Sequence, residues 1–525
     1  MDVLRNLLST QERGFLQAVS ELAYCNPFLT ERTERERAAL GREFVEGEPV
    51  WSQPVDDPET PRANVVRIFE RLEPLIHLLR VRLSSGRPAS EQELALYSDG
   101  VVHWLYLRYY RRFLAATFGP DAASHDPAKW RFYRDFLVDW ERLFHLDNRP
   151  AGIHSYLLAR DACPHVFACF RQIQCAFERI FLDVIGNSLP AARLRGAIWQ
   201  SIFTHDLRRY QRTLYGRMAD FVTLITGPSG TGKELVARAI AQSRYLPFDE
   251  QKLTFADDGA VLFFPINISA LSPALVESEL FGHRRGSFTG AIGDRKGWLE
   301  TCPAAGSVFL DELGDLDPLI QVKLLRVIET RSFHPVGGSA VRQFQGKLIA
   351  ATNRNLEAGI QNGSFREDLY YRLCSDQIAT PSLAEQLSDS PGVLRELVVY
   401  MAKRVAGQEA EEFVPEVIEW IEHNLGAAYA WPGNYRELEQ CVRNVLIRRD
   451  YRPVRAAARA PADRCVEEFR ACSLTADEML SRYCTLSYSK TGNYEEVARR
   501  LQIDRRTVKS KVDAELLKQL QAERK

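Results

Sequence analysis

A glycine-rich segment in the middle of the chain has the residue types and spacing that bind nucleotide phosphates. It consists of Gly227, Pro228, Ser229, Gly230, Thr231, Gly232 and Lys233. An apolar run precedes it and a helical pattern follows it, so backbone N–H groups and the positive end of a helix would surround the phosphates. Lys233 would reach the β- and γ-phosphates. A chance glycine-rich turn is the alternative, and the order of strand, loop and helix favours a Walker A site for ATP.

Acidic and amide side chains follow later apolar runs and complete a possible hydrolytic site. Asp311 and Glu312 end one run, and Asn353 follows another. In ATPases with such a pair, the aspartate holds Mg²⁺ through water and the glutamate polarises the attacking water. Position 234 is Glu234, whereas most P-loops place a Mg²⁺-binding hydroxyl there. Taken without its context, the pair could be two solvated acids at the end of a strand. Its position along the sequence after a P-loop favours a role in catalysis with ATP and Mg²⁺.

Two arginines lie close together in the segment FREDLYYRL. Phosphoryl transfer benefits from an arginine that reaches the γ-phosphate from a neighbouring subunit, and Arg366 and Arg372 have the required charge. Ion pairs at the surface with Glu367 and Asp368 are the alternative. Spacing alone favours these ion pairs.

A basic helical pair near the C-terminus has the pattern of a DNA-binding unit. Residues 493–501 and 505–512 are predicted helices, and Asp504 in the turn between them is a suitable N-cap. Basic residues dominate 499–511, which favours contact with phosphates, although a solvated basic hairpin remains the alternative. In a helix-turn-helix the second helix enters the major groove. The predicted DNA-binding residues are Arg505, Arg506, Thr507, Lys509, Ser510 and Lys511.

The composition is that of a water-soluble chain with several domains. Of its 525 residues, 45% are hydrophobic and 26% are charged, and the net charge of −1 neither favours nor opposes nucleic-acid binding. No apolar run approaches the roughly 18 residues of a membrane span, and residues 1–21 have no signal-peptide core. The ten cysteines include no CxxC pair, which is typical of reduced thiols. We therefore expect a cytoplasmic protein without a membrane partner.

The elements that must position these residues change in type along the chain. Helical patterns fill residues 1–200, and Pro74 predicts a kink or break in the helix over 65–83. Apolar strands then alternate with helices at 221–226, 263–268, 307–310 and 347–352, which indicates a parallel α/β sheet. Helices return from about 390, and 448–463 is rich in arginine, alanine and proline, as in a linker.

A group of thiols and one imidazole lies in the N-terminal region. Cys163, His165, Cys169 and Cys175 have no standard metal-ligand spacing and fall among apolar helical positions, so buried thiols are favoured over a metal or redox site. The aromatic residues nearby are interpreted as core rather than as a ligand cage. The region lacks the alternating β/α pattern of a phosphoacceptor receiver.

A series of ordered motifs identifies a family. GPSGTGKELVARAI, ESELFGHRRGSFTGA, FLDELGDL, QVKLLRVIE, AATNRNL, FREDLYYRL and WPGNYREL occur in that order. Together they resemble the central AAA+ domain of sigma-54-dependent activators, also called bacterial enhancer-binding proteins. The resemblance covers about 205–448, and the C-terminal pair resembles the Fis-type helix-turn-helix of these activators.

The resemblance implies roles for particular residues. Glu234 is typical of the family at its position, Asn267 would pair with Glu312 and switch it with nucleotide state, and Arg436 would sense nucleotide from the lid. Arg366 and Arg372 match the arginines that act on a neighbouring subunit. The loop that would contact sigma-54 comprises Gly286, Ser287, Phe288, Thr289, Gly290 and Ala291.

The sequence departs from the family pattern at several places. Pro228 replaces a glutamate, and Ser287 replaces an alanine in the loop signature. The tract after Pro381 lacks the family's arginine, which puts the hinge of the lid in doubt. Residues 244–262 are longer than usual and are predicted to form an extra loop.

The resulting hypothesis is a multidomain transcription activator. It has an all-α N-terminal sensory or regulatory domain (1–200), an α/β AAA+ P-loop subdomain (201–385) and an α-helical lid (386–448). A linker (449–474) leads to an all-α helix-turn-helix domain (475–525). ATP and Mg²⁺ are the expected cofactors. The expected partners are upstream DNA, sigma-54 with RNA polymerase, and further copies of the chain, from dimer to hexamer. A AAA+ ATPase that remodels another partner and a DNA-binding regulator of another polymerase form remain alternatives.

Overall fold

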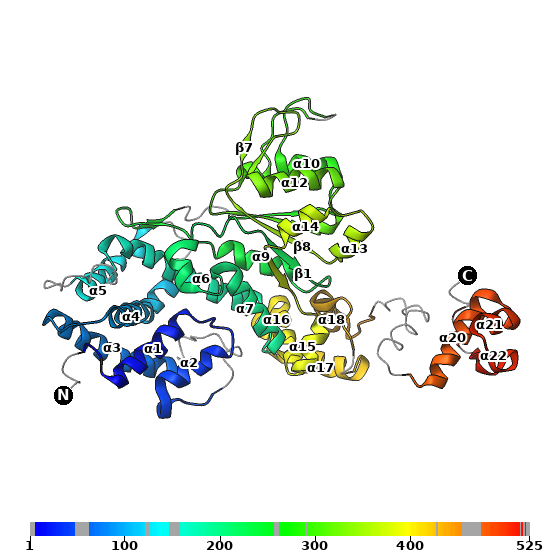
Figure 1. The fold of residues 1–525 in the computed structure, drawn as a ribbon, viewed down its shortest axis with the longest axis horizontal. Coiled ribbons are helices and arrows are strands. Elements are labelled where there is room, and N and C mark those ends of the chain that lie inside the picture. The colour runs from blue at the N-terminus through cyan, green and yellow to red at the C-terminus, as the bar shows by residue number, and fades with distance from the viewer. Residues whose placement is uncertain are drawn as a thin grey trace. The chain divides into compact units, whose positions relative to one another are not determined.

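The computed structural model describes most of the chain (Figure 1). The described residues are 6–47, 62–120, 126–145, 158–256, 262–288, 291–426, 429–453, 474–514, 516–517 and 520. The chain divides into two compact units, Met1–Leu446 and Ile447–Lys525. Among the described helices, none combines the length and the apolar character that a bilayer crossing needs.

The N-terminal part of the first unit is helical, as predicted. Its helices are α1 (Thr10–Tyr24), α2 (Glu31–Leu40), α3 (Ala63–Ser84), α4 (Glu91–Phe118), α5 (Tyr133–Phe144) and α6 (Cys163–Asp183). Short 3₁₀ turns lie at Gly41–Glu43, Pro127–Trp130 and Arg160–Ala162. Ser9 and Ser90 begin α1 and α4 with capping boxes, in which a glutamate three residues later returns the hydrogen bond.

The sequence predicted a kink or a break at Pro74, and the break is wrong, because α3 continues through the proline. Pro74 is exposed, so water can satisfy the carbonyl group that the proline leaves without a donor. On the opposite side, Leu72, Ile76 and Leu79 are fully buried. Their burial keeps the helix intact on both sides of the proline.

The predicted loop over 244–262 contains a small hairpin that completes the N-terminal core. Strands β2 (Phe248–Asp249) and β3 (Thr254–Phe255) pair antiparallel. The Phe248 ring centroid lies 4.7 Å from that of Phe167, and the Phe255 centroid lies 4.7 Å from that of Trp130. The insertion therefore binds the helical domain to the ATPase chain segment through buried aromatic contacts.

Five parallel strands form the central sheet, in the order β4-β5-β8-β1-β9. Their bounds are β1 (Thr223–Thr226), β4 (Phe263–Asn267), β5 (Ser307–Asp311), β8 (Lys347–Thr352) and β9 (Asp376–Ala379). Helices α9 (Lys233–Gln242), α10 (Pro273–Phe281), α11 (Trp298–Thr301), α12 (Pro318–Thr330), α13 (Leu356–Gln361) and α14 (Glu367–Leu373) connect them. A 3₁₀ turn (Leu313–Asp315) follows β5, and β6 (Ser332–Phe333) pairs with β7 (Arg342–Gln343). The parallel order brings the carboxyl ends of β1, β4, β5 and β8 to one edge.

Four helices follow the sheet as the predicted lid. They are α15 (Leu383–Asp389), α16 (Val393–Ala406), α17 (Ala410–Asn424) and α18 (Asn434–Arg448), with a 3₁₀ turn at Gly407–Glu409. Ser382 and Glu385 form a capping box at the start of α15. The unusual tract after Pro381 thus begins a helix, and the predicted boundary at 385 falls inside α15.

The segment α7 (Leu189–Phe203), α8 (Leu207–Arg209) and a π-helical turn η7 (Tyr210–Leu214) joins the N-terminal helices to β1. Ile198, Trp199 and Ile202 on α7 share a core with Ile225 of β1 and Ile349 of β8. The predicted boundary at residue 200 therefore falls inside a helix that packs on the sheet. Figure 1 shows α6 and α7 beside α9 and the lid helices.

The second unit contains three helices in its described residues. They are α20 (Ala476–Thr491), α21 (Tyr494–Leu501) and α22 (Arg505–Lys511). Cys484, Val497 and Val508 form their small core. Asp504 caps α22 as predicted, accepting a hydrogen bond from the Arg506 N–H at 2.7 Å.

Candidate nucleotide site

The glycine-rich loop turns tightly between β1 and α9. Gly227, Gly230 and Gly232 have φ values of +147°, +80° and +86°, in the region that favours glycine. The Lys233 ammonium donates to the carbonyl oxygens of Gly227 and Pro228 at 3.0 and 3.1 Å. The loop is therefore preformed around the lysine, with the start of α9 beneath it.

The lid holds the loop from the other side. The Tyr435 N–H donates to the Gly230 oxygen at 3.1 Å, and the Asn434 amide donates to the Ser229 oxygen at 2.9 Å. A Cβ atom on Gly230 would lie 2.3 Å from the Gly433 oxygen. Only glycine at position 230 permits this approach of the two backbones.

A cavity of about 260 Å³ opens beside the loop. Its polar side contains Lys233, Asp311, Glu312 and Arg436. Its apolar residues come from the α6–α7 segment and from the lid: Val184, Ile185, Leu194, Leu397 and Met401. The cavity therefore combines an apolar side with a side that carries both basic and acidic groups.

The charged groups of this cavity are partly desolvated. Burial raises the pKa of Asp311, and the nearby Lys233 partly opposes this. Burial lowers the pKa of Lys233, and Glu312 and Asp311 oppose that change. Both shifts mean that neighbouring protein charges only partly offset the cost of burying the charged forms of Asp311 and Lys233. An anionic phosphate beside Lys233 and a cation beside Asp311 would stabilise these charged forms.

The two carboxylates fit a Mg²⁺ ion that keeps most of its water. In the part of the chain described, no group of three or more His, Cys, Asp or Glu residues forms a metal cage. Mg²⁺ in nucleotide sites is usually bound by one or two carboxylates, waters and phosphates, which Asp311 and Glu312 allow. The Glu234 carboxylate instead accepts a hydrogen bond from the Arg238 guanidinium, one turn further along α9, at 2.7 Å.

The two asparagines lie at the expected strand ends. Asn267 is in register with Asp311, and its side-chain oxygen accepts from the Ser269 hydroxyl at 2.8 Å and the Ala270 N–H at 3.1 Å. No hydrogen bond joins Asn267 to Glu312 within the described residues. Asn353 is exposed directly after β8. Both side chains are thus near the carboxyl edge of the sheet.

The predicted arginines separate into two groups. Arg436 lies in the cavity and donates to the Ser229 hydroxyl at 3.3 Å. Arg366 bonds to Asp368 at 2.6 Å, and Arg372 lies 3.2 Å from Glu329. Both arginines are exposed. Arg366 makes one of the predicted surface ion pairs, whereas the partner of Arg372 is Glu329 rather than the predicted Glu367 or Asp368.

Several residues around the site escaped sequence reasoning, among them Thr380. Its hydroxyl lies 2.6 Å from that of the predicted Thr231 and joins the loop to the end of β9. Val184 and Leu194 carry no chemical signal, because apolar helical residues are common in any core. Asn434 had a weak signal in the WPGNYREL motif, and its φ of +51° shows the special backbone that this position needs.

The loop at Gly286 projects from the α10 side of the sheet. The Gly286 N–H donates to the Ala291 oxygen at 2.9 Å, so the loop closes on itself. Ser287 packs on Gly337, where a Cβ atom would lie 2.7 Å from that of Ser287. Phe288 is 37% exposed, with its ring 4.9 Å from that of His283. The predicted Thr289 and Gly290 lie outside the described residues.

The predicted DNA-binding residues lie on α22 in the second unit. Arg505, Arg506, Lys509 and Ser510 are exposed, whereas Thr507 and Lys511 are half-buried. Arg505 pairs with Glu495 at 3.2 Å, and Lys511 pairs with Asp477. The helix therefore presents a basic surface.

The N-terminal thiols are buried, as predicted. Cys163, Cys169 and Cys175 are each at most 2% exposed, and burial raises the pKa of Cys163 to about 12. His165 lies 2.8 Å from the Tyr245 hydroxyl and 2.7 Å from the Gln211 carbonyl oxygen. The three thiols are thus buried, and both ring nitrogens of His165 have hydrogen-bond partners within the described chain.

Comparison with known proteins identifies the domain that carries the cavity. Residues 205–379 match the family model of the sigma-54 interaction domain. The matched segment is similar to sigma-54 interaction domains, a family of AAA+ ATPase type. The sheet, the loop at Gly227 and the loop at Gly286 all lie within the matched segment.

Relatives match over the same region. The chain is 39% identical to a Nif-specific regulatory protein of Enterobacter agglomerans over 231 residues, covering 44% of this chain and 41% of that protein. It is 37% identical to the transcriptional regulatory protein ZraR of Escherichia coli (strain K12) over 298 residues, covering 56% and 63%. A crystal structure of NtrX from Brucella abortus with ATP shares 26% identity, covers 69% of this chain and 76% of that chain, and has a TM-score of 0.39. The chain thus spans about two fifths to three fifths of these curated relatives. The family model and the two sequence relatives support a sigma-54-dependent activator of the AAA+ family.

The contact between the phosphate loop and the lid predicts that nucleotide binding requires glycine at position 230. Gly230→Ala is expected to weaken binding of a fluorescent ATP analogue by roughly tenfold or more, about 1.4 kcal/mol, because the methyl group forces the lid from the loop. Gly363→Ala is the matched control, since Gly363 has a similar φ of +76° and no atom within 4 Å. The control should lose stability through backbone strain of about 1–2 kcal/mol but keep its affinity for nucleotide. Equal nucleotide affinity of Gly230→Ala and wild type would contradict the contact.

Proposed function

We propose that this chain is a sigma-54-dependent transcription activator that binds upstream DNA and uses ATP hydrolysis to remodel the closed complex of sigma-54 RNA polymerase. The observation that carries the proposal is the nucleotide cavity. It joins a P-loop lysine, two strand-end acids and a lid arginine inside a sigma-54 interaction domain. The domain also presents an exposed phenylalanine on the loop at Gly286.

The placement of these groups supports ATP hydrolysis as the proposed reaction. Lys233 and the N-terminus of α9 hold the phosphates, and Arg436 contacts them from the lid. Glu312 orients water for in-line attack on the γ-phosphate, and Asn353 and Asn267 lie at neighbouring strand ends where they assist in positioning. Asp311 would hold a Mg²⁺ ion, which would supply charge neutralisation for the phosphates.

Assembly completes the site in this proposal. Arg366 and Arg372 are exposed and lie outside the cavity of their own chain, so they can reach the γ-phosphate of a neighbour. Each makes only a surface ion pair, which is worth about 0–1 kcal/mol and is easily exchanged. A closed ring, with a hexamer as the expected size, gives every site such a neighbour.

The loop at Gly286 is the proposed contact with sigma-54. An exposed phenylalanine at a loop tip loses free energy in water unless a partner covers it. Ser287 anchors the base of the loop against Gly337, which leaves Phe288 to make the contact together with Thr289. Nucleotide-dependent movement of the AAA+ domain would then act on the promoter complex.

DNA binding is assigned to α22 as the second helix of a helix-turn-helix. Arg506 and Lys509 are exposed and form no ion pair with any other described residue. Phosphate neutralisation by such side chains drives sequence-independent affinity. A dimer of these units would fit a near-palindromic site.

Transcription from a sigma-54 promoter in a purified system tests the proposal. Phe288→Ala should hydrolyse ATP like wild type but lose roughly tenfold or more of promoter opening, since truncating an aromatic anchor costs at least about 2 kcal/mol. Val138→Ala, on an exposed apolar residue of α5, is the control and should keep both activities. Wild type that hydrolyses ATP without sigma-54 transcription would indicate another remodelling partner. Wild type that binds DNA but hydrolyses no ATP would indicate a regulator of another polymerase form.

Salt dependence tests the DNA-binding assignment separately. Removal of one phosphate contact should reduce the slope of log K against log salt by about 1. We expect this smaller slope for Arg506→Ala and for Lys509→Ala in the full chain. Lys490→Ala is the control, because it removes one positive charge from an exposed position on α20 and should leave the slope unchanged. An equal effect of all three variants would show that general charge, rather than α22, governs binding.

A further inference from the structure

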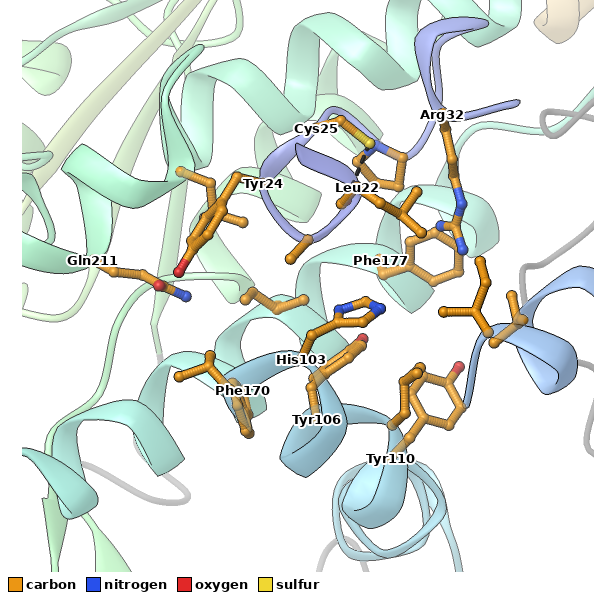
Figure 2. A pocket seen from close by; sticks show the side chains of 18 of the residues that line it. Leu22, Tyr24, Cys25, Arg32, His103, Tyr106, Tyr110, Phe170, Phe177 and Gln211 are labelled. Atoms are coloured by element: carbon orange, nitrogen blue, oxygen red, sulfur yellow. Dashed lines mark hydrogen bonds between the residues drawn. The ribbon is translucent and has the colours of Figure 1, made fainter. Parts of the chain in front are cut away.

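The first unit buries polar side chains in more than one place outside the nucleotide cavity. Among the N-terminal helices, His103 lies in the wall of a space of about 100 Å³, which Tyr106 and Phe177 also line (Figure 2). None of the described residues in this wall belongs to the phosphate loop. Thr231 and Thr380, in contrast, are buried at the phosphate loop itself, with 5% and 4% exposure. These two threonines therefore bear on how the loop is held.

The two threonine hydroxyls form a chain of hydrogen bonds that ends on the loop. Their oxygens lie 2.6 Å apart, and the Thr231 oxygen lies 2.9 Å from the Pro228 carbonyl oxygen. The Thr226 carbonyl oxygen is a second possible acceptor for Thr380 at 3.2 Å, but it already accepts from the Thr380 N–H at 2.8 Å. The shorter distances thus favour donation from Thr380 to Thr231 and from Thr231 to Pro228. Hydrogen bonds in such a chain strengthen one another.

This chain completes a row of contacts along the outer side of the loop. Three successive carbonyl groups accept hydrogen bonds there, those of Pro228, Ser229 and Gly230. The lid supplies the donors for the second and third, through Asn434 and Tyr435. The first depends on Thr231, whose hydroxyl Thr380 orients. Each planar peptide group also carries an N–H of the loop, so a fixed carbonyl oxygen fixes the direction of that N–H.

The hydroxyl chain matters most when Lys233 moves. The Lys233 ammonium also donates to the carbonyl oxygens of Gly227 and Pro228, at 3.0 and 3.1 Å. A lysine that reaches the β- and γ-phosphates in the proposed reaction has to give up these bonds. Because a carbonyl oxygen has two lone pairs, Pro228 accepts from both donors and keeps Thr231 after Lys233 leaves. The chain thereby avoids the cost of an unpaired carbonyl group in the nucleotide-bound state.

We infer that Thr380 is a positioning residue for ATP hydrolysis. Its hydroxyl acts through Thr231 to keep the Pro228 carbonyl paired, so that the loop holds its shape when Lys233 turns to the phosphates. This role rests on the proposed ATPase function. The hydroxyl lies tightly against the loop, because a Cβ atom on Gly227 would be 2.1 Å from its oxygen. A methyl group in its place would be too close to the Thr231 oxygen and could not donate.

Threonine variants of the full chain test this role. Thr380→Val should lower kcat for ATP by roughly tenfold, because the γ-phosphate is misplaced, while affinity for a fluorescent ADP analogue stays within about threefold of wild type. Thr380→Ser keeps a hydroxyl and should restore kcat. Thr223→Val is the matched control, since it removes a buried hydroxyl that joins β1 to Asp376 of β9 at the other end of these strands. The control should keep kcat even if its melting temperature falls.

The comparison of these variants decides the role of Thr380. Unchanged kcat in Thr380→Val, equal losses of kcat and ADP affinity, or no recovery in Thr380→Ser would overturn it. If Thr380→Val does not fold, Thr380→Ala removes the hydroxyl without placing a methyl group against Thr231 and should show the same loss of kcat.

Wild type that hydrolyses no ATP would refute the proposed function instead. The affinity for a non-hydrolysable ATP analogue, relative to that for the ADP analogue, then decides about Thr380. A ratio that Thr380→Val lowers and Thr380→Ser restores would support the positioning role, and an unchanged ratio would overturn it.

Discussion

The close approach of two backbones at Gly230 and Gly433 is the constraint on which the nucleotide site depends. It lets the Tyr435 N–H and the Asn434 amide reach the carbonyl oxygens of the phosphate loop. These bonds leave the loop's inward N–H groups for phosphate and bring Arg436 into the same cavity as Lys233. Without this contact, Arg436 of the lid and Lys233 of the phosphate loop would no longer lie in the same cavity.

The second organising feature is the shared use of α7. The helix packs on β1 and β8, contacts α15 of the lid, and contributes to the walls of several cavities in the first unit. The hairpin at Phe248 adds a further attachment, because its aromatic rings lie in the N-terminal core. The helical domain and the ATPase domain consequently form one compact unit rather than two independent ones.

Local signals predicted the parts of the site that depend on local chemistry. The P-loop, the Asp311–Glu312 pair and the Asp504 cap each follow from a few adjacent residues with a defined backbone role. The strand β9 was missed because it is short and only Ile378 on it is buried. The break at Pro74 and the boundary at 200 were wrong, and the hairpin inside the predicted extra loop over 244–262 was missed, for a common reason. In each case distant residues decide the outcome, through burial of Leu72 and Ile76, of Ile198 and Trp199, or of Phe248 and Phe255.

The same distinction explains what sequence reasoning could not find in the cavities. Val184, Leu194 and His103 look like ordinary core residues along the chain, and only the packing of several helices shows that they face open space. Residues with a distinctive charge, such as Arg366 and Arg372, were easy to find but lie outside the cavity of their own chain.

Hydrogen exchange along the whole chain, with and without an ATP analogue, tests most directly whether loop, lid and α7 form one nucleotide site. The structure predicts that the analogue slows exchange in three separate segments. These are the phosphate loop with the start of α9, the lid helices α16 and α18, and α7. Slower exchange in the phosphate loop alone, with α7 and the lid unchanged, would contradict the account.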